Sequence, residues 1–182
     1  IVQGGVDPGL RVESAERTVQ VGFDGYAVGG LSVGETRSEM LDSLDGVTAC
    51  LPSDQPRYFM GLGDPVGLVE VVARGIDMFD CVLPTRHARH GTVLTTGGRL
   101  NLRNARFATD DQPLDPEFPA SPAHRWSRAY LRHLLLTDEP TGPRLLTLHN
   151  LAWLLDFVAR LRVAILDGRF GEFRAETLAV WS

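Results

Sequence analysis

The strongest constraint on the fold of this chain is a regular alternation of short apolar runs with amphipathic stretches. Apolar runs at residues 1–3, 26–28, 57–60 and 78–83 predict strands, and the stretches 8–21, 35–45 and 64–74 between them predict helices. Consecutive parallel strands need a crossover connection, which is usually a helix. The first part of the chain therefore predicts an α/β architecture built from βα units.

A different pattern begins after residue 91. Residues 92–106 alternate polar and apolar side chains around Gly97 and Gly98, which predicts a β-hairpin. Residues 125–136 and 145–166 predict helices, and the second helix contains an apolar stripe that we expect to face a core. The stripe consists of Leu145, Leu146, Leu148, Leu151, Leu154, Leu155, Val158 and Leu161.

We expect the βα units to form half of a TIM (β/α)8 barrel, because a complete barrel typically takes about 250 residues. The predicted organisation is a half-barrel over residues 1–91, an insertion hairpin with a small subdomain over 92–150, and a C-terminal helical segment over 151–182. We expect the other half of the barrel to lie outside this chain.

Positive charge gathers in one stretch of an acidic chain. Residues 1–85 hold 5 arginines against 13 acidic residues, whereas residues 86–132 hold 8 arginines against 4 acidic residues. Guanidinium groups pair bidentately with phosphate oxygens, so this stretch is a candidate RNA surface. A solvated face of mixed charge is the alternative. The arginines are Arg86, Arg89, Arg99, Arg103, Arg106, Arg125, Arg128 and Arg132.

The composition favours a cytoplasmic protein. The apolar runs fall short of the roughly 20 residues that a membrane span needs, so we expect no membrane segment. Cys50 and Cys81 are the only cysteines, too few for a disulfide framework, which fits a reducing compartment.

The ends of the predicted strands carry residues that suit a ligand site. In parallel barrels, functional residues lie at the C-terminal ends of the strands. Those ends carry a glycine pair after Gln3, the pair Gly29–Gly30, the segment 60–63, and Asp80. Glycine lets a planar ligand reach backbone groups. Each glycine pair alone is more typical of a tight turn. Four such strand ends at the same end of the barrel favour a ligand-binding site.

Asp80 is the strongest candidate for chemistry. It lies in the apolar run 78–83, where an ionised carboxylate is costly unless it is paired or functional. A carboxylate held there can attack an electrophilic sugar carbon and form a covalent intermediate. A carboxylate bonded to neighbouring backbone amides at a strand end is an equal alternative.

Seven segments together resemble the tRNA-guanine transglycosylase, or queuine tRNA-ribosyltransferase, family. They run in the family's order over essentially the whole chain, and Val33 resembles the bacterial form. The segments are IVQGG (1–5), GFDGYAVGGLSVGE (22–35), RYFMGLG (57–63), RGIDMFDCVLPTR (74–86), NLRNAR (101–106), WSRAYL (126–131) and LTLHNL (146–151). The resemblance implies the C-terminal half of a (β/α)8 barrel. It also implies exchange of the wobble guanine of tRNA for a 7-deazaguanine, a queuosine precursor, which requires base flipping.

The resemblance assigns roles to individual residues. Asp80 corresponds to the nucleophile that attacks the ribose and holds the RNA covalently. The base-pocket positions are Gln3, Gly30, Leu31, Tyr58 and Met60, with recognition assigned to the Gln3 amide, the Gly30 N–H and the Leu31 carbonyl. Two segments match RNA contacts, namely Gly61, Leu62, Gly63, Asp64, Pro65, Val66 and Gly67, and then Thr85, Arg86, His87, Ala88 and Arg89.

The family's structural zinc site does not carry over to this sequence. Its C-x-C-x2-C ligands fall on Phe118, Ala120 and Ala123, which leaves only His149. One imidazole does not make a tetrahedral site. We therefore expect no cofactor and a degenerate zinc-type subdomain held by packing alone.

The resemblance also implies partners and leaves alternatives. tRNA, a deazaguanine base and the N-terminal half of the barrel are the implied partners, and homodimerisation stays open. Because the family's acid/base carboxylates belong to the other half, we expect the isolated chain to be inactive. The alternatives are a noncatalytic RNA-binding accessory subunit, against which Asp80 argues, and a DNA-modifying paralogue, against which the 85–89 segment argues.

Overall fold

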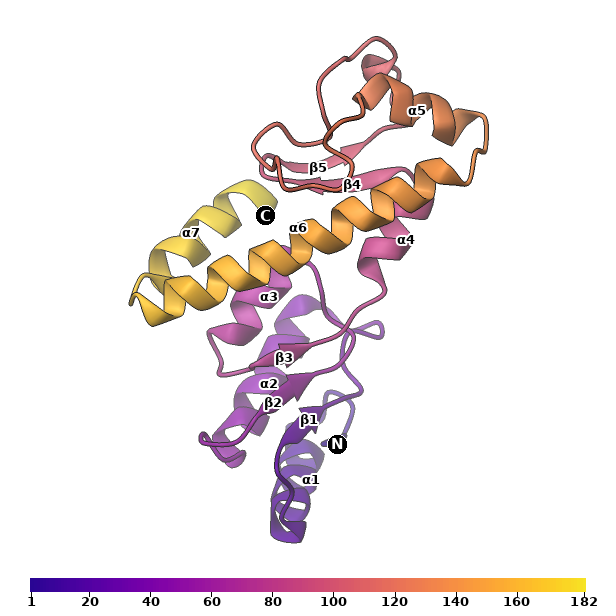
Figure 1. Cartoon of the computed structure of the whole chain (residues 1–182). Coiled ribbons are helices and arrows are strands. Elements are labelled where there is room, and N and C mark those ends of the chain that lie inside the picture. The colour runs from indigo at the N-terminus through magenta and orange to yellow at the C-terminus, as the bar shows by residue number, and fades with distance from the viewer. The chain divides into compact units, whose positions relative to one another are not determined.

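The computed structural model describes all 182 residues and divides them into two compact units, Ile1–Cys81 and Val82–Ser182. The first unit alternates helices and strands, which confirms the predicted βα units (Figure 1). Its elements are α1 (Pro8–Val21), β1 (Tyr26–Val28), α2 (Arg37–Cys50), β2 (Arg57–Phe59), α3 (Pro65–Val72) and β3 (Met78–Phe79).

The strands of the first unit form a parallel sheet in the order β1-β2-β3. Val2 adds a fourth position beside β1, where it forms a parallel bridge with Val28. The Val2 N–H donates to the Ala27 carbonyl at 2.7 Å, and the Gly29 N–H donates to the Val2 carbonyl at 3.0 Å. Four consecutive strand ends therefore lie side by side, as the sequence predicts.

Local side-chain caps fix where the helices of this unit begin. The Asp7 carboxylate accepts from the Leu10 N–H at 2.9 Å at the start of α1. Thr36 and Glu39 form a capping box at the start of α2, in which each side chain satisfies a backbone N–H of the first turn. Helix α2 runs five residues beyond the predicted end, to Cys50, because its buried face continues to Val47.

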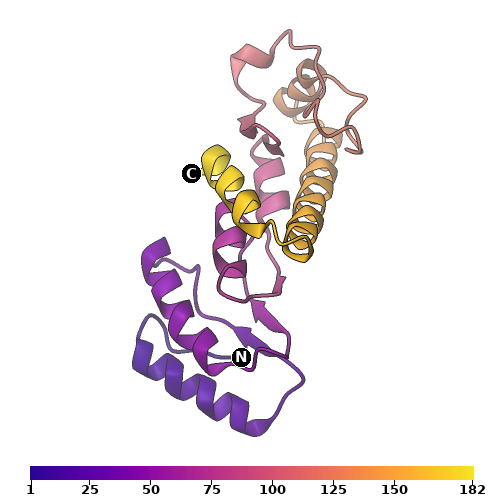
Figure 2. The ribbon, with the colours of Figure 1, turned by 90° about the vertical axis from the view of Figure 1, so that its left-hand side faces the viewer.

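The core of the first unit lies between the sheet and its helices. Helices α1 and α2 pack side by side (Figure 2). The core is formed by Val2, Ala15, Tyr26, Val28, Leu31, Met40, Leu44, Val47, Leu51, Phe59, Leu62, Val71 and Ile76. Leu31 anchors the loop after β1 in this core, with its side chain 3% exposed.

The second unit is built around one long helix. Its elements are α4 (Leu83–Arg89), β4 (Thr92–Thr95), β5 (Gly98–Asn101), the 3-10 helix η1 (Ala105–Phe107), α5 (Arg128–Leu136), α6 (Thr141–Leu166) and α7 (Phe170–Trp181). β4 and β5 form the predicted antiparallel hairpin, with Thr95 paired with Gly98 at the turn. Helix α6 contacts α4, β4, α5 and α7 (Figure 1).

The boundary between the units differs from the predicted one. The strand predicted over 78–83 ends at Phe79, and Leu83 begins helix α4, with Pro84 in the first turn. Proline suits that position because its missing N–H would be unpaired there anyway. Helix α4 packs on α6 and β4, so the units divide after Cys81 rather than after residue 91. The second predicted division, after residue 150, falls inside the continuous helix α6.

The buried face of α6 also differs from the predicted leucine stripe. Leu145, Leu146 and Leu161 are buried as predicted, whereas Leu148, Leu151 and Leu155 are exposed in this chain. The buried positions instead continue through polar and aromatic residues, His149, Asn150, Trp153 and Phe157. No helix of the structure is both long and apolar enough to cross a bilayer.

Candidate active site

Asp80 lies immediately after β3, where the neighbouring strand holds it. In the β2–β3 register Tyr58 pairs with Met78. Because side chains alternate between the faces of a strand, Tyr58, Met60, Met78 and Asp80 project from the same face of the sheet. The Tyr58 hydroxyl donates to Oδ1 of Asp80 at 2.5 Å, and the Gly61 N–H donates to the same oxygen at 3.0 Å.

These two hydrogen bonds favour the ionised form of Asp80. The Tyr58 hydroxyl, and then the Gly61 N–H, hold the pKa of the Asp80 carboxyl below its ordinary value. The same bond raises the pKa of Tyr58. Asp80 is therefore an ionised carboxylate at neutral pH. Both donors bind Oδ1 of Asp80, and neither of them binds Oδ2.

The surroundings of Asp80 are more exposed to solvent than its apolar sequence context predicts. Its neighbour Met78 is exposed, and so is Asp80 itself. Its backbone partner is a single amide, that of Gly61, and its other partner is a phenol. A carboxylate that is ionised, oriented and accessible has the properties of a nucleophile.

Gln3, Gly29, Gly30 and Met60 come together at the neighbouring strand ends. The Met60 N–H donates to the Val28 carbonyl at 3.1 Å, which aligns the ends of β1 and β2. A Cβ atom built on Gly29 would lie 3.5 Å from Sδ of Met60. A Cβ atom built on Gly30 would lie 2.8 Å from Oε1 of Gln3, and Gly30 has a φ of +66°. Only glycine fits at position 30 without displacing Gln3.

Two charged residues that the sequence analysis did not single out support this region. Arg11 is fully buried, and its guanidinium donates to the carbonyls of Gly5 at 2.5 Å, Gly29 at 3.1 Å and Gly30 at 3.2 Å. Burial lowers the pKa of Arg11, and the charge of Glu35 partly offsets that effect. No helical or strand periodicity in the sequence marks either residue.

Glu35 closes the loop that follows Gly30. Its carboxylate accepts hydrogen bonds from the Ser32 N–H and, at 3.1 Å, from the Val33 N–H. Burial raises the pKa of Glu35, but these backbone donors outweigh burial and hold it below its ordinary value. Ser32 has a φ of 62°, a conformation that is uncommon for a residue other than glycine. The Glu35 carboxylate therefore compensates for backbone strain in this loop.

The first segment assigned to RNA contact is largely internal. Leu62, Gly63, Pro65 and Gly67 are buried, whereas Gly61 is exposed. The Asp64 side chain accepts from the Gly67 N–H at 2.9 Å and pairs with Arg37 at 2.9 Å. Within this segment, only Gly61 is exposed and Asp64 and Val66 are partly exposed. A partner could therefore contact the segment at these three residues.

The second segment assigned to RNA contact forms helix α4 and exposes two cations. Arg86 and Arg89 are exposed, whereas Ala88 is fully buried. Burial lowers the pKa of His87, and the positive charges of Arg99, Arg86 and His90 lower it further. Positive charge therefore concentrates around α4 and the start of β5.

The other arginines of the basic stretch differ in their surroundings. Arg128 pairs with Asp110 at 3.1 Å and donates to the Leu114 carbonyl, so it holds the fold of its own unit. Arg106 and Arg125 lie over the rings of Phe107 and Trp126. The basic stretch is thus a mixture of structural arginines and accessible ones.

The residues present do not fit the structural zinc ion that the resemblance implies. No group of three metal-binding side chains occurs in the structure. The Nε2 atom of His149 lies 2.7 Å from the Leu94 carbonyl, and its Nδ1 atom lies 2.7 Å from Oγ of Ser121. A carbonyl only accepts, so Nε2 carries the proton and Nδ1 accepts from Ser121. Both nitrogens are therefore occupied.

This arrangement corrects the expectation that packing alone holds the subdomain. Phe118 packs edge-on against the His149 ring, with centroids 6.1 Å apart. The Ser121 hydroxyl also accepts from the Ala123 N–H at 3.1 Å. Burial lowers the pKa of His149, so the ring stays neutral. A buried hydrogen-bond chain from Ser121 through His149 to Leu94 accompanies the packing.

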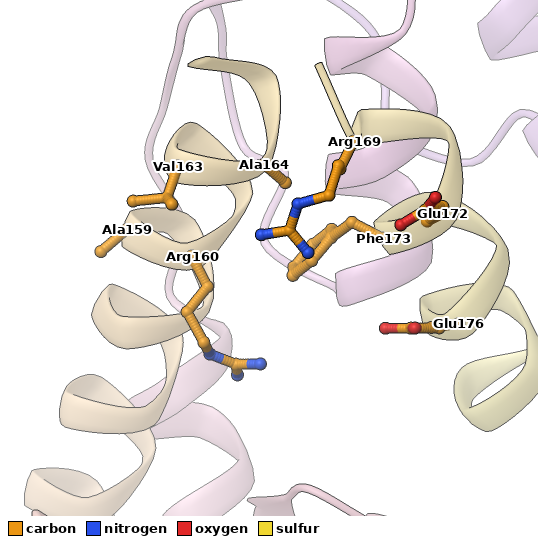
Figure 3. Close-up of a pocket in the computed structure, with 8 residues that line it drawn as sticks. All are labelled: Ala159, Arg160, Val163, Ala164, Arg169, Glu172, Phe173 and Glu176. Carbon is orange, nitrogen blue, oxygen red and sulfur yellow. The ribbon is translucent and has the colours of Figure 1, made fainter. Parts of the chain in front are cut away.

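A cavity of about 350 Å³ lies between α6 and α7, and none of the predicted site residues lines it (Figure 3). Arg160, Arg169 and Phe173 project into it (Figure 3). Arg160 pairs with Asp156 at 2.7 Å and Arg169 with Asp167 at 3.2 Å. Both cations are already paired with nearby carboxylates, and Asp80 and its neighbours remain the candidate active site.

Comparison with known proteins identifies the family of this chain. The family described as queuine tRNA-ribosyltransferase matches residues 1–182. The queuine tRNA-ribosyltransferase of Solidesulfovibrio magneticus is 52% identical over all of this chain and 48% of its own length. That of Caulobacter vibrioides is 50% identical over 98% of this chain and 48% of its own length. The chain spans about half the length of the curated relatives it matches. The chain belongs to the queuine tRNA-ribosyltransferase family.

Proposed function

We propose that the protein containing this chain is a tRNA-guanine transglycosylase that exchanges the wobble guanine of tRNA for a 7-deazaguanine. The observation that carries the proposal is the Asp80 carboxylate, which is ionised, oriented by Tyr58 and Gly61, and accessible. The parallel βα units are consistent with a contribution to a (β/α)8 barrel completed by the other half of the protein.

The proposed reaction has two substitutions at one carbon. An Asp80 oxygen attacks C1′ of the ribose, and the bond from C1′ to N9 of guanine breaks. Guanine leaves with its electron pair and takes a proton from a carboxyl group that the other half of the protein would supply. The deazaguanine then gives its N9 proton back to that same group, now a carboxylate, and attacks C1′, which releases the Asp80 carboxylate. The RNA strand stays intact throughout, because the phosphodiester bonds take no part.

Groups that suit a guanine-like base lie at the neighbouring strand ends. The Gln3 amide and the Gly30 N–H offer donors and an acceptor to the edge of a guanine-like base, and Met60 offers an apolar face. The exposed Arg86 and Arg89 of α4 provide cations for RNA phosphates. We expect this reaction in the cytoplasm, and the free thiols of Cys50 and Cys81 are usual for proteins of a reducing compartment.

The test is exchange of labelled guanine into tRNA by the full-length protein and by its Asp80→Asn variant. Loss of the nucleophile should lower the exchange rate by more than about a thousandfold and abolish a denaturation-resistant tRNA adduct. tRNA affinity should stay nearly unchanged, because phosphate contacts dominate it. The exposed, unbonded Asp54 provides the matched control, Asp54→Asn.

Other outcomes would point to other functions. tRNA binding without exchange in the unsubstituted protein would support an accessory subunit. Exchange in DNA but not in tRNA would support a DNA-modifying enzyme. An adduct that persists in Asp80→Asn would assign the nucleophile to another residue.

A further inference from the structure

Arg11 is buried in a way that ordinary packing does not explain. It lies in α1, is fully buried, and makes no ion pair within salt-bridge distance. Its Nη1 atom is buried and has no hydrogen-bond partner. A buried charge is costly unless polar groups compensate it. Besides the charge of Glu35, the compensation comes from three carbonyl groups, all belonging to the two glycine turns at the candidate active site.

Those carbonyl bonds fix the direction of the neighbouring N–H groups. A trans peptide is planar, so its N–H points opposite to its C=O. Arg11 holds the Gly29 carbonyl, and the N–H of Gly30 belongs to that same peptide. It also holds the Gly30 carbonyl, whose peptide carries the N–H of Leu31. Both N–H groups therefore point away from Arg11, and neither donates to a protein acceptor.

The third carbonyl bond acts on the turn that follows Gln3. Nε of Arg11 holds the Gly5 carbonyl at 2.5 Å. A Cβ atom on Gly4 would lie 2.9 Å from Cγ of Arg11, so the turn closes directly over this side chain. One guanidinium thus ties the turn after Gln3 to the turn containing Gly30. Its planar fork of donors is what allows three acceptors to be held at once.

We propose that Arg11 is a positioning residue for base recognition. It aims the Gly30 N–H and keeps the Gln3 side chain beside it, so that both donors meet one edge of the base. The inference rests on the proposed function, in which Gly30 and Gln3 recognise the base. Arg11 itself does not touch the base in this proposal. It acts by orienting Gly30 and Gln3, which do.

The experiment measures KM for guanine and KM for tRNA separately in the full-length protein and its Arg11→Lys variant. Lysine keeps the charge but loses the planar fork. We expect KM for guanine to rise about tenfold or more, as for a weakened charged hydrogen bond, with KM for tRNA changed less than about twofold. Arg17→Lys on the same helix is the control, because Arg17 is 76% exposed and pairs only with Glu13.

The outcomes separate this inference from the proposed function. A protein that exchanges guanine but whose folded Arg11→Lys variant keeps its KM for guanine overturns the positioning role alone. A purely structural role would lower the melting temperature and the fraction of active protein, and leave KM for guanine unchanged. Failure of the unsubstituted protein to exchange guanine overturns both proposals.

A second measurement tests the inference without the Arg11→Lys variant, in case that variant does not fold. In the unsubstituted protein, hydrogen exchange of the Gly30 amide is followed with and without guanine. An N–H held ready for the base should exchange without protection in the free protein and slow markedly when guanine binds. Equal exchange in both states overturns the inference.

Discussion

The Tyr58 hydroxyl donates a hydrogen bond to Oδ1 of Asp80 across 2.5 Å, between two neighbouring parallel strands. This bond is the largest cause of the lowered pKa of Asp80. It connects the register of the sheet to the chemistry, because a shift of β3 by one residue would turn Asp80 to the other face.

Tyr58→Phe should move the acidic limb of the pH profile of kcat/KM to higher pH. The nucleophile must be ionised, and in the unsubstituted protein its pKa lies below the ordinary 3.8. Removing the hydroxyl raises that pKa, so activity should be lost at a higher pH as the pH falls. Activity at pH 7 should change by only about a few-fold, since Asp80 remains ionised there. Tyr130→Phe, whose hydroxyl makes no hydrogen bond, should leave the profile in place.

Arg86 and Arg89 should contribute to the salt dependence of tRNA binding. Replacing both with glutamine should reduce the slope of log Kd against log salt by roughly 0.7–0.9 per lost phosphate contact. Filter binding over a range of salt concentrations measures the slope. Arg162, which is exposed on α6 and unpaired, provides the control Arg162→Gln. An unchanged slope in the double variant would mean that these arginines form only a solvated face.

We predict that the protein contains no structural zinc. His149 offers both ring nitrogens to Leu94 and Ser121, and Phe118, Ala120 and Ala123 offer no ligand atom. Protein prepared in zinc-containing medium should hold far less than one zinc per chain by elemental analysis. Adding a chelator should leave the melting temperature unchanged. Stoichiometric zinc that raises the melting temperature would contradict this prediction and require ligands elsewhere.

Asn150→Ala should destabilise the protein strongly. The buried Asn150 side chain accepts from the Leu94 N–H at 2.9 Å and donates to the Pro84 and Thr92 carbonyls at 3.1 and 3.0 Å. Its removal leaves buried backbone groups unpaired, which costs about 1–3 kcal/mol each. Urea unfolding should show a loss of about 2–4 kcal/mol, whereas Arg144→Ala on the same helix should have little effect. A loss below about 0.5 kcal/mol would show that water replaces the amide.

The sequence by itself determined the elements whose causes are local. The Asp7 cap, the Thr36–Glu39 capping box and the Gly97–Gly98 hairpin depend on residues within a few positions of one another. The order of the parallel strands followed from the βα rhythm, and that order placed Asp80, Gly30 and Gln3 at one edge of the sheet. These features were predictable because short-range hydrogen bonding and hydrophobic periodicity leave direct patterns in the sequence.

Only the tertiary structure decided which polar residues became buried anchors. Arg11 reaches carbonyls 6, 18 and 19 residues away, and Asn150 reaches partners 56 to 66 residues away. His149 was visible in the sequence as a solitary zinc ligand, yet its partners are a serine and a distant carbonyl. On helix α6, the same long-range packing buried Trp153 and Phe157 and left Leu155 exposed. A polar side chain is stable in a core only when such partners meet it, and separations of this length leave no periodic pattern in the sequence.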